Sequence, residues 1–142
     1  MDQKSLQPFH LAIPVRDLGA AEAFYGGVMG CEQGRRSRDW IDFNFFGHQL
    51  VVHLSPAESS ETARNIVDSK QVPVRHFGVV LAVPAWKALA KRLEGAGCAF
   101  LIEPCLRHEG EPGEQHTMFL LDPSGNALEF KAMTNPENLF AS

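Results

Sequence analysis

Apolar and polar residues follow the same order in both halves of the chain. In the first half, strict alternation predicts a strand at 10–15, and helical spacing of apolar residues predicts a helix from Asp17 to about Met29. In the second half, alternation predicts a strand at 76–83, followed by a helix that begins near Pro84. The chain therefore contains two copies of one strand–helix unit.

The later parts of the two halves match as well. The predicted strand at 40–46 corresponds to 116–122, and the turn and strand at 47–53 correspond to 125–130. Each half is therefore β-α-β-β-β, and this period is long for a solenoid. We predict one α+β domain spanning 1–142, in which two βαβββ modules form a cup-shaped mixed sheet with helices on the outer face.

The remaining segments give the expected boundaries. Module one is expected at about 6–56 and module two at about 73–133, followed by a C-terminal tail at 134–142. The polar segment at about 57–72 is the predicted linker, with a short helix near 61–67. The Gly-, Pro- and charge-rich insertion at 103–115 is predicted to be a surface loop or lid.

Composition narrows the class of protein. The chain has 142 residues, 44% of them hydrophobic and 21% charged, and a formal net charge of −4, which argues against nucleic acid or membrane as the main partner. The N-terminus lacks an apolar signal segment, so we expect the cytoplasm. Three cysteines without C-x-x-C spacing indicate reduced thiols.

Four polar residues occupy the first and last strands of the two modules. Strand parity places His10 and His53 in module one, and His76 and Glu129 in module two, opposite the apolar side chains of their strands. If the two sheets curve toward each other, these side chains converge. Three imidazoles and one carboxylate suit a divalent metal, namely Fe²⁺, Mn²⁺, Ni²⁺ or Zn²⁺. A single histidine on a strand would more often be a structural or half-exposed residue.

At these residues the chain resembles the vicinal oxygen chelate superfamily, which includes glyoxalase I, bleomycin-resistance proteins and extradiol dioxygenases. The resemblance rests on His10 with Val15-x-Asp17-Leu18, on His76, and on the segment from Asp122-Pro123 to Glu129. The resemblance implies that His10, His76 and Glu129 hold the metal as a two-His-one-carboxylate set. It is close to bacterial single-domain proteins of that superfamily.

The chain differs from glyoxalase I at one position. Glyoxalase I typically has a glutamate ligand and base at the place that we assign to His53, whereas extradiol dioxygenases have an acid–base histidine at a comparable place. We therefore expect a metal-dependent, dioxygenase-like oxidoreductase that uses Fe²⁺, with His53 as the catalytic acid–base group or a fourth ligand. A glyoxalase-type isomerase or lyase is the alternative, and a bleomycin-resistance-like binding module is the second alternative.

Two further residues are candidates for lining the substrate site, His116 and Phe45. The expected partner is a small molecule, and a homodimer is expected because proteins that resemble this one often dimerise. The modules could pair within one chain or between two, so that His10 and Glu129 of one site could come from different subunits.

Overall fold

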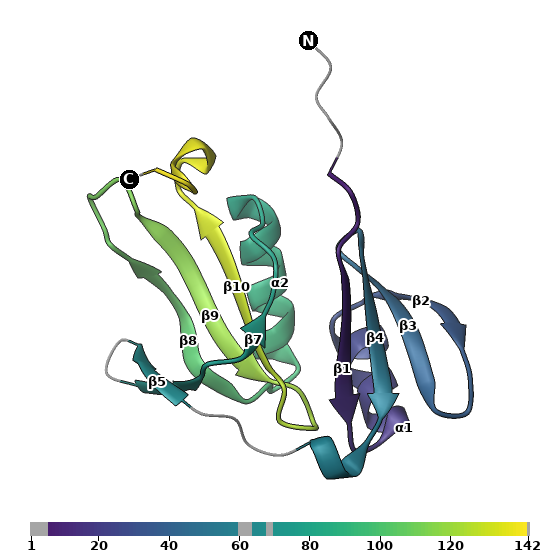
Figure 1. The fold of residues 1–142 in the computed structure, drawn as a ribbon. Coiled ribbons are helices and arrows are strands. Elements are labelled where there is room, and N and C mark those ends of the chain that lie inside the picture. Colours follow the sequence, from purple (N-terminus) through teal and green to yellow (C-terminus); the bar gives the residue numbers. More distant parts are fainter. Residues whose placement is uncertain (1–5, 60–63, 68–69, 142) are drawn as a thin grey trace.

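The computed structural model describes residues 6–59, 64–67 and 70–141, and these form two four-stranded sheets and a small hairpin (Figure 1). The strand order is β1-β4-β3-β2 in the first sheet and β7-β10-β9-β8 in the second. In each sheet the first and last strands of a module pair in parallel, whereas the other pairs are antiparallel. The predicted pair of βαβββ modules is confirmed.

Module one follows the predicted order closely. Its elements are β1 (His10–Val15), α1 (Leu18–Ala21), the π-helix η1 (Glu22–Val28), β2 (Glu32–Arg36), β3 (Trp40–Phe45) and β4 (His48–Leu54). Asp17 begins α1 as its N-cap, because its carboxylate accepts a hydrogen bond from the Ala20 amide at 2.9 Å. Ile13 and Val15 are buried, so β1 turns its apolar residues inward, as alternation predicts.

Module two contains β7 (His76–Phe77), α2 (Val83–Gly95), β8 (Phe100–Arg107), β9 (Gln115–Leu121) and β10 (Ala127–Met133). The predicted strand at 76–83 is shorter in the structure, because regular pairing with β10 ends at Phe77 and only an isolated bridge from Val80 to Lys131 follows. The predicted loop at 103–115 is also shorter, since residues 103–107 belong to β8. Apolar residues within that segment, such as Leu106, sustain pairing with β9.

The segment between the modules differs from the expected short helix. It contains the 3₁₀ turn η2 (Pro56–Glu58), and β5 (Arg64–Val67) pairs with β6 (Lys70–Pro73) as an antiparallel hairpin. Residues 61–63 of the expected helix lie outside the described residues, but 64–67 are a strand. The β-branched pair Ile66-Val67 favours this outcome, and Val72 packs on Ile102 and Phe119 of module two. A last 3₁₀ turn, η3 (Pro136–Asn138), lies in the C-terminal tail.

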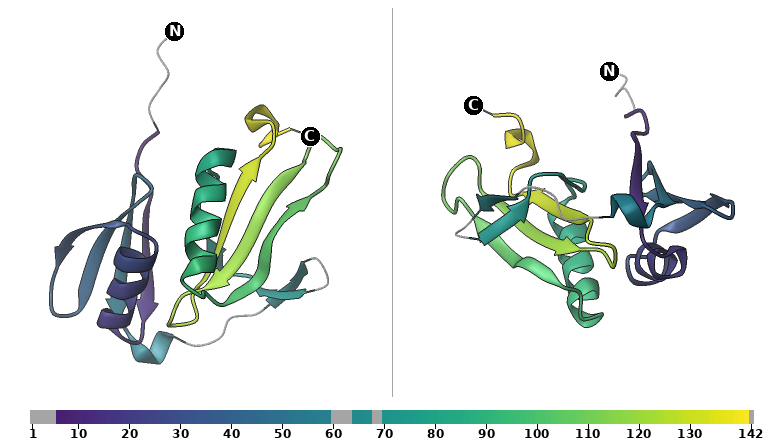
Figure 2. Two further views of the ribbon diagram at one scale, coloured as in Figure 1. Left: turned by 180° about the vertical axis from the view of Figure 1, so that it is seen from behind. Right: turned by 60° about the horizontal axis from the view of Figure 1, so that its bottom comes forward.

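The two modules share one hydrophobic core on the side of the helices. Figure 2 shows α1 and α2 on the same side of the two sheets, and most of the buried apolar residues of both modules form a single cluster. Phe45 of module one packs on Phe77 and Phe130 of module two, with ring centroids 5.6 and 5.9 Å apart. The Arg92 Nε of α2 donates to the Val28 carbonyl at 2.6 Å. The contacts between the modules thus include their helix-covered faces.

A buried polar contact also joins the modules. The Tyr25 hydroxyl of η1 donates to the Asp122 carboxylate at 2.7 Å, and Asp122 organises the turn before β10 by accepting from the Ser124 and Asn126 amides. Burial, together with the adjacent Asp122 carboxylate, raises the pKa of Tyr25 well above its usual value. Tyr25 therefore stays a protonated donor over the whole physiological range.

Tyr25→Phe is expected to lower the free energy of unfolding by about 1–3 kcal/mol, because one oxygen of a buried carboxylate loses a charge-assisted donor. Urea unfolding followed by circular dichroism measures this change. Ser37→Ala, which removes an exposed hydrogen bond to the Asp39 amide, is the control and should stay within about 0.5 kcal/mol. Equal stability of Tyr25→Phe and the natural protein would contradict this role for the hydroxyl.

Within the described residues, no helix is both long and apolar enough to cross a membrane.

Candidate metal centre

The structure gives each sheet a second face, opposite its helix, that we call the polar face. In module two this face carries Thr117, Glu129 and Lys131, whereas Leu128 and Phe130 on β10 point into the core. Glu129 is buried although it lies on this face. A buried carboxylate is costly unless it is paired or hydrogen-bonded, so its contacts indicate its role.

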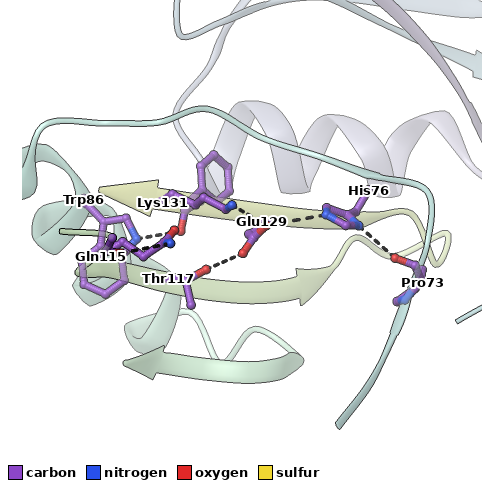
Figure 3. A network of polar contacts seen from close by, with 9 residues as sticks. Pro73, His76, Trp86, Gln115, Thr117, Glu129 and Lys131 are labelled. Atoms are coloured by element: carbon purple, nitrogen blue, oxygen red, sulfur yellow. Dashed lines mark hydrogen bonds and ion pairs between the residues drawn. The ribbon is translucent and has the colours of Figure 1, made fainter. Parts of the chain in front are cut away.

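Glu129 has three polar neighbours (Figure 3). The Thr117 hydroxyl donates to Glu129 Oε2 at 2.6 Å, a short bond typical of a carboxylate acceptor. The other oxygen, Oε1, lies 3.6 Å from His76 Nε2 and 3.8 Å from Lys131 Nζ. Both separations exceed normal hydrogen-bond lengths, so Oε1 faces two nitrogen atoms without bonding directly to either.

The orientation of His76 follows from its other ring nitrogen. His76 Nδ1 lies 2.9 Å from the Pro73 carbonyl oxygen, which can only accept, so Nδ1 carries the proton. In the neutral form of the imidazole, Nε2 then presents its lone pair toward Glu129. The edge of the ring also packs on Phe119, with the centroids 4.8 Å apart, which holds the imidazole in place.

His10 lies on the polar face of module one. It is exposed, and its Nδ1 is 2.7 Å from Gln49 Oε1 on the neighbouring strand. Among the residues that the structure describes, no three His, Cys, Asp or Glu side chains are gathered closely enough to hold one metal ion. Within one chain, the structure therefore brings together His76 and Glu129 but does not add His10 to them.

The strand register gives His53 a different counterpart from the one that the repeat suggested. His10 pairs with Gln49 as His76 pairs with Ala127, so Glu129, two residues beyond Ala127, corresponds to Val51. His53 lies two residues farther along β4 and corresponds to Lys131. It is exposed on the polar face of module one. An apolar residue thus occupies the place in module one that Glu129 occupies in module two.

The two candidate lining residues lie on the helix-covered faces. His116 stacks on Trp86 of α2, with ring centroids 4.9 Å apart, on the opposite side of β9 from Thr117. Phe45 is buried in the shared core and borders a cavity of about 210 Å³ between the modules. A second cavity of about 320 Å³ lies between β1 and β7 and is lined by residues that include Pro14, Arg75 and His76.

Gly78 needs its small size for a reason that the sequence does not reveal. In the structure, a Cβ at Gly78 would lie 1.6 Å from the Glu129 carbonyl oxygen. The missing side chain therefore allows close contact between backbones, and that contact positions the strand that carries Glu129.

The His76–Glu129 pair fits a divalent metal. Two ligands on one ion, each about 2.1 Å from it, lie roughly 3.0–3.4 Å apart, close to the 3.6 Å between Nε2 and Oε1. Each side chain is also held from behind, His76 by the Pro73 carbonyl and Glu129 by Thr117, as is typical of metal ligands. The geometry of His76 and Glu129 would therefore allow both side chains to bind one ion.

Sequence reasoning missed three residues that surround the candidates: Thr117, Lys131 and Gln49. Alternation along β10 puts Lys131 on the same face as Glu129, but only the cross-strand register shows that Thr117 and Gln49 are neighbours of Glu129 and His10. Alternation within single strands does not contain that register. The register of the antiparallel pairs β3–β4 and β9–β10 could have been estimated from the turns that precede β4 and β10.

Comparison with solved structures finds the same fold in several proteins. A glyoxalase/bleomycin resistance protein/dioxygenase from Alicyclobacillus acidocaldarius is 38% identical, with a TM-score of 0.78, and the match covers 94% of this chain and 96% of that one. A genomically encoded fosfomycin resistance protein from Listeria monocytogenes is 17% identical over 97% of this chain and 100% of its own, with a TM-score of 0.69. A lactoylglutathione lyase from Agrobacterium tumefaciens is 21% identical over 99% and 100%, with a TM-score of 0.62.

The two more distant structures share the fold, and their identities are too low to transfer an activity. No curated protein matches the chain. The model of the Glyoxalase/Bleomycin resistance protein/Dioxygenase superfamily matches residues 7–130, which include His10, His76 and Glu129. The chain belongs to this superfamily, the vicinal oxygen chelate proteins that its motifs resemble.

Proposed function

We propose that the protein is a metal-dependent enzyme whose divalent ion is held by His76 and Glu129 of one copy and His10 of a second copy. The observation that carries this proposal is the pair formed by His76 Nε2 and Glu129 Oε1, which face each other at 3.6 Å without a hydrogen bond. Two imidazoles and one carboxylate leave open coordination positions for a substrate.

The second copy is needed because of how the modules pack. Within one chain they share a core on their helix-covered faces, whereas His10 on the polar face of module one is not gathered with His76 and Glu129. A twofold dimer that sets module one of each copy against module two of the other would create two equivalent sites. The exposed side chain of His10 is available for such a contact.

For the reaction, we favour extradiol dioxygenase-type chemistry with Fe²⁺. Val51 stands in module one where Glu129 stands in module two, so the second carboxylate ligand expected of a glyoxalase I-type site is missing. A bound ferrous ion would supply activation of adjacent substrate oxygens and of dioxygen. His53, on the same polar face as His10, is the proposed acid–base group, and the proposed substrate is a small catechol-type molecule.

The reaction is tested with anaerobically Fe²⁺-loaded protein. We expect oxygen uptake with at least one member of a broad catechol panel and a loss of that uptake in His53→Ala, with the metal retained. Formation of a thioester from methylglyoxal and glutathione would favour the glyoxalase-type alternative. Tight metal binding without either reaction would contradict both versions. No metal binding would favour the metal-free binding module.

Two further proposals concern the setting of the protein. A cytoplasmic location is supported by the free thiols of Cys31 and Cys98, because reduced thiols are typical of that compartment. A homodimer is required by the proposed site. Sedimentation of the metal-loaded protein at micromolar concentration should give a dimer, and a monomer with full metal occupancy would contradict the shared site.

Lys131→Met is expected to raise the affinity for the divalent metal by about fivefold. The Lys131 ammonium lies 3.8 Å from Glu129 Oε1, so it would repel an ion bound there; because Lys131 is partly exposed, the repulsion is worth only about 1 kcal/mol. Titration of the metal-free protein with Zn²⁺ measures the change. Lys87→Met, on an exposed position of α2, is the control. An unchanged or weaker affinity in Lys131→Met would contradict binding at Oε1.

A further inference from the structure

The polar face of module one contains a chain of three side chains that starts at a buried carboxylate. Asp42 on β3 is buried, and its Oδ2 lies 3.3 Å from Gln49 Nε2 on β4. Gln49 Oε1 in turn lies 2.7 Å from His10 Nδ1 on β1. The three side chains therefore cross three neighbouring strands in one line, and His10 is at its exposed end.

The donors and acceptors in this chain have a single consistent assignment. An ionised carboxylate can only accept, so the amide nitrogen of Gln49 must face Asp42 and its carbonyl oxygen must face His10. That oxygen also only accepts, so His10 Nδ1 must carry the proton. In the neutral imidazole, His10 Nε2 then has a lone pair and no hydrogen-bond partner among the described residues.

From this geometry we infer that Gln49 and Asp42 are positioning residues that fix His10 in the tautomer with the proton on Nδ1. This inference extends the proposed function and rests on it. The tautomer of His10 matters because a metal binds the unprotonated nitrogen of a neutral imidazole. The Gln49 carbonyl oxygen thus fixes the proton of His10 on Nδ1, as the Pro73 carbonyl oxygen does for His76. The two histidines reach it by different means, a side-chain amide in one module and a backbone carbonyl in the other.

The surroundings of Asp42 explain why the Gln49 amide turns its nitrogen toward Asp42 and its oxygen toward His10. Among the described residues, Arg35 forms an ion pair with Asp42; its side chain is 84% exposed, and its Nε lies 3.9 Å from the carboxylate. Such an exposed pair contributes little. The Gln49 amide is therefore the direct hydrogen-bond donor to Asp42. Because a buried carboxylate without a donor is costly, this contact favours the orientation in which the amide nitrogen faces Asp42.

The inference is tested first without any metal, by ¹⁵N NMR of the imidazoles in metal-free protein at about pH 8.5, where histidine is neutral. The His10 signals, assigned with His10→Ala, are expected to show Nδ1 protonated. Gln49→Leu should shift most of the population to Nε2–H, the form that the unconstrained histidine side chain favours in water. Gln49→Glu, which keeps an acceptor beside Nδ1, should retain the Nδ1–H form.

Metal binding supplies the second readout. Gln49→Leu should weaken Zn²⁺ binding by about 10- to 100-fold, the usual cost of losing a partner behind a metal ligand. Gln33→Leu makes the same change on β2 of the same sheet and should alter neither the tautomer nor the affinity. Asp42→Asn should loosen the amide orientation and give a smaller shift in the same direction.

The two proposals can fail separately. A His10 ring with its proton on Nε2 in the natural protein, or an unchanged tautomer and affinity in Gln49→Leu, would overturn the positioning role. If the protein shows the predicted tautomer but binds no Zn²⁺, the proposed metal centre is wrong. The hydrogen-bond assignment of Asp42, Gln49 and His10 would then stand, but it would not serve metal binding.

Discussion

Glu129→Ala is expected to lower the affinity for a divalent metal by at least about 100-fold. Glu129 is the only carboxylate in the proposed ligand set, and its Oε1 is the oxygen that faces His76 Nε2. Loss of a partner behind a ligand already costs about 10- to 100-fold, so loss of the ligand itself should cost more. Anaerobic titration of metal-free protein with Fe²⁺ measures the affinity and the number of sites per chain.

Glu103→Ala is the matched control for this change. Glu103 is an exposed carboxylate on β8 of the same sheet, so its removal lowers the net negative charge equally and should leave the affinity unchanged. A comparison of the melting temperatures of the two variants separates loss of the site from loss of the fold. A Glu129→Ala protein that is folded and binds Fe²⁺ as tightly as the natural protein would exclude Glu129 as a ligand.

Gly78→Ala is expected to destabilise the protein by more than about 3 kcal/mol. The added Cβ would lie 1.6 Å from the carbonyl oxygen of Glu129, and backbone atoms on both sides would have to move. The shift would displace His76 from Glu129, because the two residues lie on the strands that this contact joins. Both stability and metal affinity should therefore fall, which chemical unfolding and metal titration measure independently.

Gly27→Ala is the appropriate comparison for Gly78→Ala. No atom lies within 4 Å of a Cβ at Gly27, and the residue lies within the helix η1, where alanine is preferred to glycine. This control should be neutral or slightly stabilising. If Gly78→Ala were equally harmless, the contact between the two backbones would not be the reason for glycine at that position.

Much of the fold could be predicted because the signals are local. Helical spacing and Asp17 located the first helix, and alternation correctly assigned the inward face of β1. The hairpin at 64–73 and the short β7 were missed, because they depend on contacts with module two, such as Val72 on Phe119 and Gly78 on Glu129. Contacts between distant segments override local propensity there.

The candidate site was only partly accessible to the sequence, for a different reason. Strand parity assigns His10, His76 and Glu129 to polar faces, but it does not place those faces relative to one another. The two modules share a core on the side of their helices, an arrangement governed by large buried residues such as Phe45 and Phe130. The pairing of His76 with Glu129 could be predicted, whereas the separate placement of His10 could not.

The central claim is that one metal site contains residues of two chains, and mixing two variants tests it most directly. His10→Ala and Glu129→Ala should each bind no metal tightly. In a refolded equimolar mixture, about half of the dimers are mixed, and each mixed dimer has one site with every ligand intact, so about a quarter of the natural binding capacity should return. A mixture that stays as inactive in metal binding as its two components, despite demonstrated exchange of subunits, would contradict the shared site.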